Sequence, residues 1–350
     1  MNYKKNTMTV NGMVDSNQLG VCLPHEHLFI DIRFISSESK SSKEIVNINN
    51  LHELSIDYTS IADNLFLDSY ETALHEVNQF KKFGGKTIVD SSSIGAGRQP
   101  ELLKKISCET DINIVMGTGF YIMPSLPKSI LEENESNLIK TLIKECRDGF
   151  SDTGIRPGII GEVGVNPSIE AWDRKSLKVA SAVQKETGLP ISVHIQAVPV
   201  VSNFTQPNGL EVIKLLEEFG ADLEKTVICH TDAKIDLDYI TSLLKTGVYA
   251  ELDHFGKDFY FPESNFLMSR DMDRVLAISK LVEQGYGRRL LISTDICLKN
   301  DLTTYGGHGY AHILRKIFPM MKNNGLDDTA IHQITNNNVH EWLSIDSRYL

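Results

Sequence analysis

Two histidines separated by a single residue, His25 and His27, follow a short apolar run near the start of the chain. In an extended segment alternate side chains point to the same side, so both imidazoles would face one way while Glu26 faces the other. Such a pair can supply half of a metal site. On its own the spacing is weak evidence, because histidine pairs of this kind also occur on ordinary protein surfaces.

Four more residues of metal-binding type follow other short apolar runs: Glu162, His194, His230 and Asp295. Taken singly, each has an ordinary explanation as a core histidine, a surface carboxylate or a helix cap. Together with the first pair they are hard to explain as packing, because burying four histidines and two carboxylates is costly unless they are paired or bind metal. Six ligands exceed the four of a tetrahedral zinc site, so two metals that share a bridging carboxylate fit better.

The charges of such a centre indicate its chemistry. Two divalent cations bring four positive charges, and Glu162, Asp295 and a bridging hydroxide return three, which leaves an electrophilic site. A bridging water would become a nucleophile near neutral pH, and the second metal would polarise the carbonyl or phosphoryl oxygen under attack. The pattern therefore predicts hydrolysis.

The elements that must position these residues are short β-branched runs that alternate with longer amphipathic stretches. Eight runs predict strands, at 21–23, 87–90, 112–117, 158–160, 191–193, 227–229, 248–252 and 290–292. Between them, apolar residues recur every three to four positions in helical stretches that end at Gly84, Gly188 and Gly220. Near-continuous apolar strands alternating with amphipathic helices indicate parallel strands covered on the outside.

Eight such units predict a single (β/α)8 TIM barrel, an α/β fold, over residues 1–350. An open doubly wound sheet is the alternative, but its phosphate-binding fingerprint is missing, and the glycines at 306–309 read as a turn. Residues 36–64 show little periodicity and are expected to form a long loop excursion at the barrel rim, a candidate lid. In a barrel of this type the metal site would lie at the C-terminal ends of the strands.

Composition excludes several classes of protein. The chain of 350 residues has 35 Lys and Arg against 46 Asp and Glu, a net charge of −11, which disfavours binding to nucleic acid or to an anionic membrane surface. No apolar run approaches the ~18 residues of a membrane span. The first seven residues lack the apolar core of a secretory signal, so we expect a cytoplasmic protein. Five cysteines without a CxxC pair argue against a disulfide framework and a cysteine-rich zinc site.

Several motifs along the chain resemble the phosphotriesterase-like branch of the amidohydrolase superfamily. They are the segments at 19–21, 24–28, 84–90, 117–121, 161–164, 293–295 and 305–310. The resemblance implies a binuclear centre of two divalent ions, usually zinc. One metal would be held by His25, His27 and Asp295 and the other by His194 and His230. Asp295 would also orient the hydroxide and accept its proton.

One departure from the best-known members of that family concerns the bridging ligand. Those members use a carbamylated lysine on the fourth strand, whereas this sequence has Glu162 there and no lysine nearby. In this respect it is similar to the phosphotriesterase homology proteins and the phosphotriesterase-related proteins. Because a glutamate bridge needs no carbon dioxide to assemble, we expect bicarbonate to have no effect on reconstitution of the metal-free protein.

Other residues matched by the resemblance lie around the expected centre. Tyr121 matches the tyrosine that lies near the metal-bound oxygen in lactonase members. His254 matches the histidine that passes on a proton from the aspartate in the true phosphotriesterases, although position 233 is an alanine and only Asp232 could continue that relay. The alternative is that His254 only lines the pocket. Three cations expected on rim loops, Arg98, Lys257 and Lys299, could bind an anionic part of a substrate, or they could be solvated surface charges.

The preferred hypothesis is a zinc-dependent hydrolase in which the bridging hydroxide attacks the carbonyl of a carboxylic ester or lactone, with Tyr121 possible at the oxyanion. The alternatives are a phosphotriester hydrolase and an N-acyl amide hydrolase. Amides are an option because residues 305–314 resemble phosphotriesterase-related proteins, some of which are associated with hydrolysis of N-acyl amino compounds. A non-catalytic binding protein is the remaining alternative. The partner would be a small-molecule substrate, and a homodimer is a common outcome for this architecture.

Overall fold

The computed structural model describes residues 5–36, 42–198, 207–346 and 349. Eight parallel strands form one sheet in the order β14-β11-β10-β9-β8-β7-β6-β3, which confirms all eight predicted strands. Their bounds are β3 (Val21–Glu26), β6 (Gly85–Asp90), β7 (Asn113–Thr118), β8 (Ile159–Val165), β9 (Ile191–Ile195), β10 (Thr226–Ile228), β11 (Tyr249–Leu252) and β14 (Leu290–Ile292). Nearly every residue in them is buried, as expected for strands covered on both faces.

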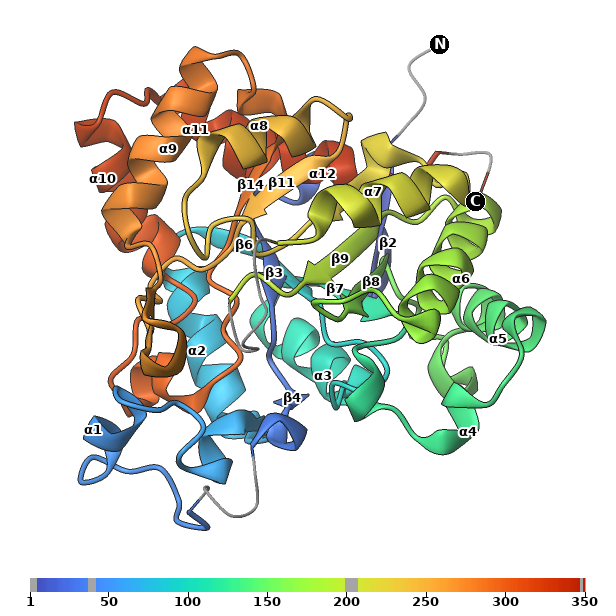
Figure 1. The fold of residues 1–350 in the computed structure, drawn as a ribbon, viewed down its shortest axis with the longest axis horizontal. Helices are drawn as coiled ribbons and strands as arrows, with labels where there is room; N and C mark the ends of the chain where they lie inside the picture. Colours follow the sequence, from blue (N-terminus) through green and yellow to red (C-terminus); the bar gives the residue numbers. More distant parts are fainter. Residues whose placement is uncertain (1–4, 37–41, 199–206, 347–348, 350) are drawn as a thin grey trace.

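Helices follow the strands and cover the sheet on its outer side (Figure 1). They are α2 (Tyr70–Lys82), α3 (Pro100–Thr110), α4 (Lys128–Leu131), α5 (Glu135–Asp148), α6 (Ala171–Thr187), α7 (Gly209–Glu218), α8 (Leu237–Leu244), α9 (Asp271–Glu283), α10 (Phe318–Asn323), α11 (Asp328–His332) and α12 (Asn338–Leu343). Local signals mark the ends of these helices, and the predicted stop at Gly188 is one of them. Ser69 caps α2 by accepting a hydrogen bond from the Thr72 amide, and α6 ends at Gly188, whose φ of 67° favours glycine.

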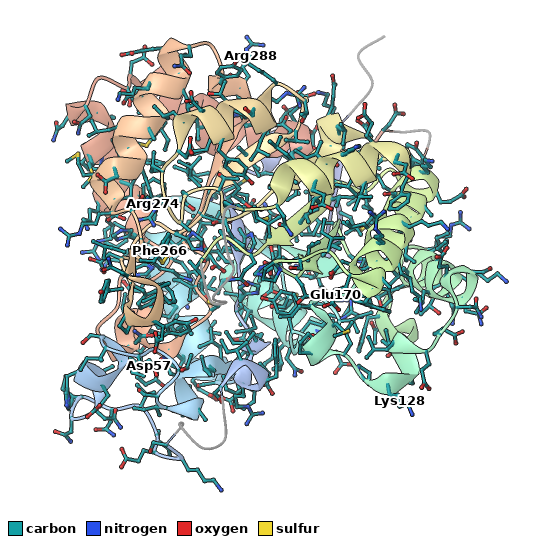
Figure 2. All side chains as sticks on the ribbon, in the orientation of Figure 1. Asp57, Lys128, Glu170, Phe266, Arg274 and Arg288 are labelled. Carbon is teal, nitrogen blue, oxygen red and sulfur yellow. The ribbon has the colours of Figure 1, made fainter. Side chains whose placement is uncertain are left out.

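The first and last strands of the sheet meet and close the barrel. The Asp295 amide donates to the His25 carbonyl at 3.2 Å, and the His25 amide donates to Ser293 Oγ at 3.1 Å. Glu26 points away from the two imidazoles, as predicted, and its buried carboxylate accepts hydrogen bonds from residues 293, 294 and 296. The arrangement is a (β/α)8 TIM barrel whose strand residues are almost all buried. Figure 2 draws the side chains on this ribbon.

Glu26 is expected to be important for stability, because one side chain joins the two ends of the sheet. Its Oε1 accepts from Ser293 Oγ at 2.7 Å and from the Thr294 amide at 2.9 Å, and its Oε2 accepts from the Ile296 amide at 2.9 Å. Glutamine at this position would turn an amide group toward buried donors. We expect Glu26→Gln to lower the free energy of unfolding by about 3 kcal/mol. A urea midpoint shift at unchanged m-value measures this, and a loss below about 0.5 kcal/mol would contradict it.

The excursion predicted at 36–64 is more ordered than its composition suggested. Residues 37–41 lie outside the described part, but the remainder includes α1 (Leu51–Leu54) and a small apolar cluster of Val46, Leu54 and Ile61. At its base, β4 (Ile30–Asp31) pairs with β5 (Phe66–Leu67) in an antiparallel arrangement. The sequence of this excursion shows little hydrophobic periodicity because its helix is short and its apolar cluster is small.

This excursion lies against a second loop on the same rim. Tyr58 packs on Phe259 and Phe261, with ring centroids 5.2 and 6.1 Å apart, and the second loop continues as the hairpin of β12 (Tyr260–Phe261) and β13 (Phe266–Leu267). Near the N-terminus, β1 (Asn6–Thr9) and β2 (Gly12–Asp15) form a separate antiparallel hairpin. None of the helices in the described residues is both long and apolar enough to cross a membrane.

Candidate metal centre

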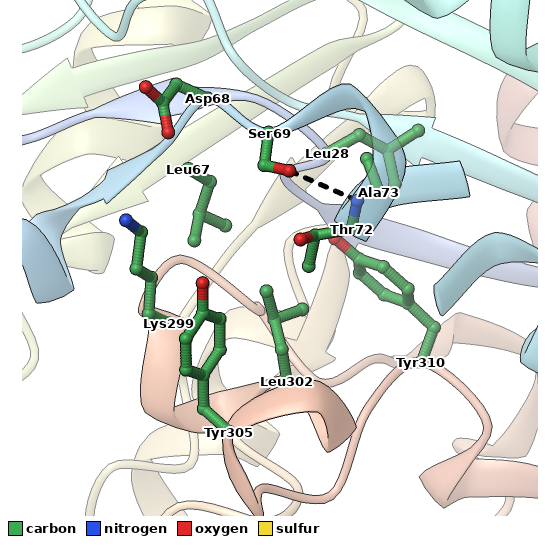
Figure 3. Close-up of a pocket in the computed structure, with 10 residues that line it drawn as sticks. All are labelled: Leu28, Leu67, Asp68, Ser69, Thr72, Ala73, Lys299, Leu302, Tyr305 and Tyr310. Carbon is green, nitrogen blue, oxygen red and sulfur yellow. Dashed lines mark hydrogen bonds between the residues drawn. The ribbon is translucent and has the colours of Figure 1, made fainter. Parts of the chain in front are cut away.

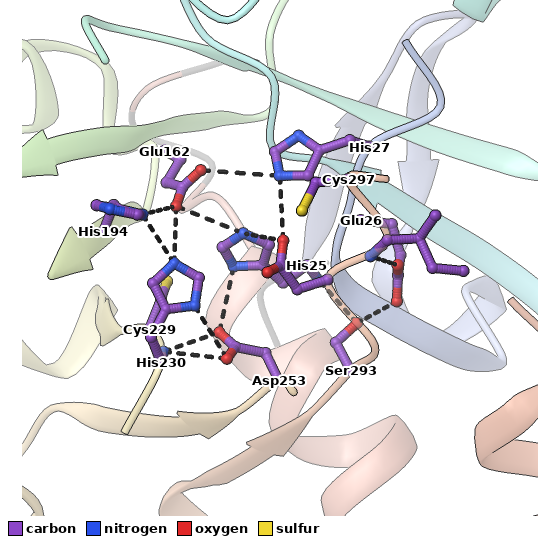
Figure 4. A network of polar contacts seen from close by, with 12 residues as sticks. His25, Glu26, His27, Glu162, His194, Cys229, His230, Asp253, Ser293 and Cys297 are labelled. Carbon is purple, nitrogen blue, oxygen red and sulfur yellow. Dashed lines mark hydrogen bonds and ion pairs between the residues drawn. The ribbon is translucent and has the colours of Figure 1, made fainter. Parts of the chain in front are cut away.

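The barrel brings all six predicted metal ligands together at the C-terminal ends of its strands. Figure 4 shows the four histidines and Glu162 facing one another. The six residues lie in β3, β8 and β9 or in the segments that follow β3, β10 and β14: His25, His27, Glu162, His194, His230 and Asp295. Two of them, His230 and Asp295, have left-handed backbone angles, with φ of 60° and 46°. Such angles are uncommon for residues with a Cβ and persist where the surrounding structure holds them.

One group of ligands consists of His25, His27 and Asp295. The Asp295 Oδ1 lies 3.4 Å from His27 Nε2 and 3.8 Å from His25 Nε2, so three ligand atoms face a common point. The His25 Nε2 is fully buried and has no hydrogen-bond partner among the residues that the structure describes. Because an unpartnered buried nitrogen is costly, a bound cation is the fitting partner for it.

The second group consists of Glu162, His194 and His230. The Glu162 Oε1 lies 2.6 Å from His194 Nδ1 and 3.0 Å from His230 Nε2, and the two nitrogens are 2.8 Å apart. The same carboxylate faces the first group, since its Oε1 is 3.7 Å from His25 Nε2 and its Oε2 is 3.8 Å from His27 Nε2. Glu162 therefore stands between the two groups, where a bridging ligand is needed. The donor set of imidazole nitrogens and carboxylate oxygens fits divalent zinc.

The carboxylates and histidines of the centre shift the pKa values of one another. Burial raises the pKa of Glu162, but its interactions with His194, His25 and His230 outweigh this and hold that pKa well below its usual range. Burial lowers the pKa of His230, and Asp253 and Glu162 more than reverse this, raising it to about 10. In the metal-free protein, protons on histidine thus take the place that cations would occupy.

Three further side chains contact the Nδ1 atoms of His25, His27 and His230. None of the three was predicted from the sequence. Asp253 accepts a hydrogen bond from the His230 amide at 2.9 Å and lies 3.1 Å from its Nδ1, while Ser92 Oγ lies 2.9 Å from His27 Nδ1. Glu251 Oε2 lies 3.1 Å from His25 Nδ1. The signal in the sequence was a pair of carboxylates, two positions apart, at the end of an apolar strand.

A chain of polar contacts leads away from Asp295. Its Oδ2 lies 4.0 Å from His254 Nε2, and His254 Nδ1 lies 2.8 Å from Asp232 Oδ1. Arg274 Nε donates to Asp232 Oδ2 at 2.6 Å from a fully buried position. Burial raises the pKa of Asp232, but His254 and Arg274 outweigh it and lower that pKa below its usual range. The structure thus places Asp232 where the sequence left the continuation of the relay open.

Tyr121 lies beside the second group of ligands. Its ring centroid is 5.2 Å from that of His194 and 6.2 Å from that of Phe34. Burial raises the pKa of the Tyr121 hydroxyl well above its usual range, and the negative Glu162 and Asp295 raise it further. The phenol therefore stays neutral and keeps a proton to donate.

The three cations expected on the rim are not solvated surface charges, because each pairs with a carboxylate and has a mostly buried side chain. Arg98 makes a bidentate contact with Glu145 at 2.5 and 2.7 Å. Lys299 Nζ lies 2.6 Å from Asp63 Oδ1. It also lines a pocket of about 10 Å³, enough for about one water molecule (Figure 3).

Lys257 is the one of these cations that reaches the centre. Its Nζ contacts the Asp295 carbonyl and lies 2.9 Å from Asp295 Oδ2 and 3.3 Å from Cys297 Sγ. The two oxygens of Asp295 thus have different surroundings: Oδ1 faces the ligand histidines, whereas Oδ2 faces Lys257 and His254. An anionic substrate group would have to share Lys257 with Asp295.

The geometry agrees with comparisons to known proteins. The family model described as the phosphotriesterase family matches residues 5–343. An N-acetyltaurine hydrolase from Dictyostelium discoideum is 35% identical, covering 96% of this chain and 97% of its own. A phosphotriesterase-related protein from Nematostella vectensis is 36% identical over the same shares of the two chains. A crystal structure of a resiniferatoxin-binding protein from Rhodobacter sphaeroides has a TM-score of 0.90 and 34% identity, covering 99% of this chain and 96% of that one. The chain belongs to the phosphotriesterase family.

Proposed function

We propose that the protein is a zinc-dependent hydrolase that cleaves N-acyl amides of small amino compounds. The observation that carries the proposal is the likeness along almost the whole chain to relatives named N-acetyltaurine hydrolase, which are 31–35% identical. The arrangement of Asp295, His254 and Asp232 supports the same conclusion, because an amide needs a group that returns a proton to its leaving nitrogen. Sequence reasoning favoured an ester or lactone and kept an amide as an alternative.

In amide cleavage, Asp295 and His254 would transfer the proton from the attacking water to the leaving nitrogen. Bound divalent ions would supply an acidified water and polarise the substrate carbonyl. Asp295 Oδ2, which faces His254, would receive the proton of the attacking water. His254 would take that proton with its Nε2, held in place by the contact of its Nδ1 with Asp232, and would deliver it to the departing nitrogen.

The neutral phenol of Tyr121, next to His194, would stabilise the negative charge that develops during the reaction. A hydroxyl that keeps its proton can donate a hydrogen bond to the oxygen on which negative charge develops. This contribution does not distinguish an amide from an ester, because both pass through a tetrahedral oxyanion. Ester or lactone hydrolysis is the second candidate, because Tyr121 stands where the lactonase members of the family have a tyrosine.

A substrate screen with a variant at the relay position tests the proposal. Zinc-loaded protein would be assayed with N-acyl amino acids, N-acyl aminosulfonates, lactones, aryl esters and phosphotriesters. We expect kcat/KM to be highest for an N-acyl compound. We also expect His254→Gln to lower that value about 100-fold, while an aryl ester with a good leaving group is affected far less. Faster turnover of lactones or phosphotriesters, or equally feeble rates on all five classes, would contradict the proposal.

A further inference from the structure

Strand β11 supplies two carboxylates to the interior of the barrel, Glu251 in the strand and Asp253 just after its end. Residues two apart on a strand point to the same side, so both reach toward the C-terminal centre. Both side chains are fully buried. Two adjacent buried carboxylates repel each other and lose their hydration, so each needs a specific positive or hydrogen-bonding partner.

The nearest histidines of these two carboxylates belong to different groups of metal ligands, and Asp253 Oδ2 also lies 3.6 Å from His25 Nδ1. Glu251 Oε2 lies 3.1 Å from Nδ1 of His25, which faces Asp295 with its other nitrogen. Asp253 Oδ1 lies 3.1 Å from Nδ1 of His230, which faces Glu162 with its other nitrogen. A carboxylate behind Nδ1 fixes the tautomer and the ring orientation that leave Nε2 free to bind a cation.

Two unpartnered atoms lie at opposite ends of the pair formed by Glu251 and His25. The Glu251 Oε1 and the His25 Nε2 are both buried and, within the described residues, both lack a hydrogen-bond partner. Cys229, on the neighbouring strand, adds a thiol but no fixed positive charge. A cation on His25 Nε2 would give that nitrogen its partner and would balance the carboxylate behind the ring.

We propose that Glu251 is a positioning residue for the metal held by His25 and His27, and that Asp253 serves the metal held by His194 and His230. One strand would thus orient both halves of the centre, each through one histidine. The inference rests on the metal centre proposed above and is independent of the substrate. It predicts that a substitution at Glu251, which contacts His25 and not His230, weakens one metal and spares the other.

The test is a metal titration of metal-free protein, using Zn²⁺ in competition with a chromophoric chelator. Wild-type protein is expected to bind two ions. Glu251→Gln should bind one ion as the wild type does and the other about 10- to 100-fold more weakly. In a His194→Ala background, which keeps only the first group of ligands intact, adding Glu251→Gln should weaken the remaining ion by the same factor.

A matched control is Glu76→Gln, which alters another fully buried carboxylate whose hydrogen bonds come from Thr303 and Thr304. It should leave both zinc affinities unchanged. Glu251→Asp, which keeps the charge but retracts it from His25, should repeat the affinity loss if the glutamine variant folds poorly. Wild-type affinities at both sites in folded Glu251 variants would overturn the inference. A wild-type protein that binds no zinc would instead overturn the metal centre itself.

Discussion

Replacing Glu162 with glutamine is expected to lower kcat/KM by about 1,000-fold or more and to reduce the zinc content below two ions per chain. Each oxygen of this carboxylate faces a different set of nitrogens: Oε1 lies 2.6 Å from His194 Nδ1, and Oε2 lies 3.8 Å from His27 Nε2. Glutamine keeps one ligand oxygen and replaces the other with an amide group that cannot bind a cation. Steady-state kinetics and elemental analysis of the same preparation measure both effects.

The control for Glu162 is again Glu76→Gln, which removes a buried charge far along the chain from every ligand and should retain both zinc ions. Wild-type protein stripped of metal should also regain activity equally fast with and without bicarbonate, because the bridge is a glutamate. Full activity and two zinc ions in Glu162→Gln would contradict a bridging role. A marked bicarbonate requirement would point to a different bridging group.

The convergence of the six candidate ligands could be predicted from the sequence because the barrel makes position informative. Carboxyl ends of parallel strands meet at one rim, so residues such as His27 and Asp295 converge although they are far apart along the chain. Only the strand ends were needed for this inference, and the apolar runs mark those ends clearly. Side-chain geometry was not needed at all.

The residues behind the ligands could not be assigned in the same way. Glu251 and Arg274 act through partners far away along the chain, and a buried carboxylate or guanidinium in a sequence does not reveal which neighbour it will contact. The cations show the same limit. Arg98 pairs with Glu145, 47 positions away, and a long flexible side chain on a loop can reach partners in many directions. Composition suggested free rim charges, whereas the fold gives each of them a carboxylate.

Zinc binding is expected to release protons and therefore to tighten steeply as the pH rises. Burial lowers the pKa of His230, but Asp253 and Glu162 outweigh it and raise that pKa to about 10, so this imidazole carries a proton at pH 7 in metal-free protein. The pKa of His25 is also raised well above its usual range, by Cys229 and Glu162 against the effect of burial. A cation must displace both protons, one in each group of ligands, because only a neutral imidazole can bind it.

The sign of the pH effect follows from these two histidines. Their raised pKa values stabilise the metal-free fold below pH of about 6.5, the ordinary value for histidine, and the part due to His230 is lost as the pH rises toward about 10. Over the same range the apparent zinc affinity should increase about tenfold per pH unit for each displaced proton. Calorimetry in two buffers of different ionisation enthalpy counts the protons released. An affinity that stays flat between pH of about 6.5 and 8, with no proton release, would show that both imidazoles are already neutral before metal binds.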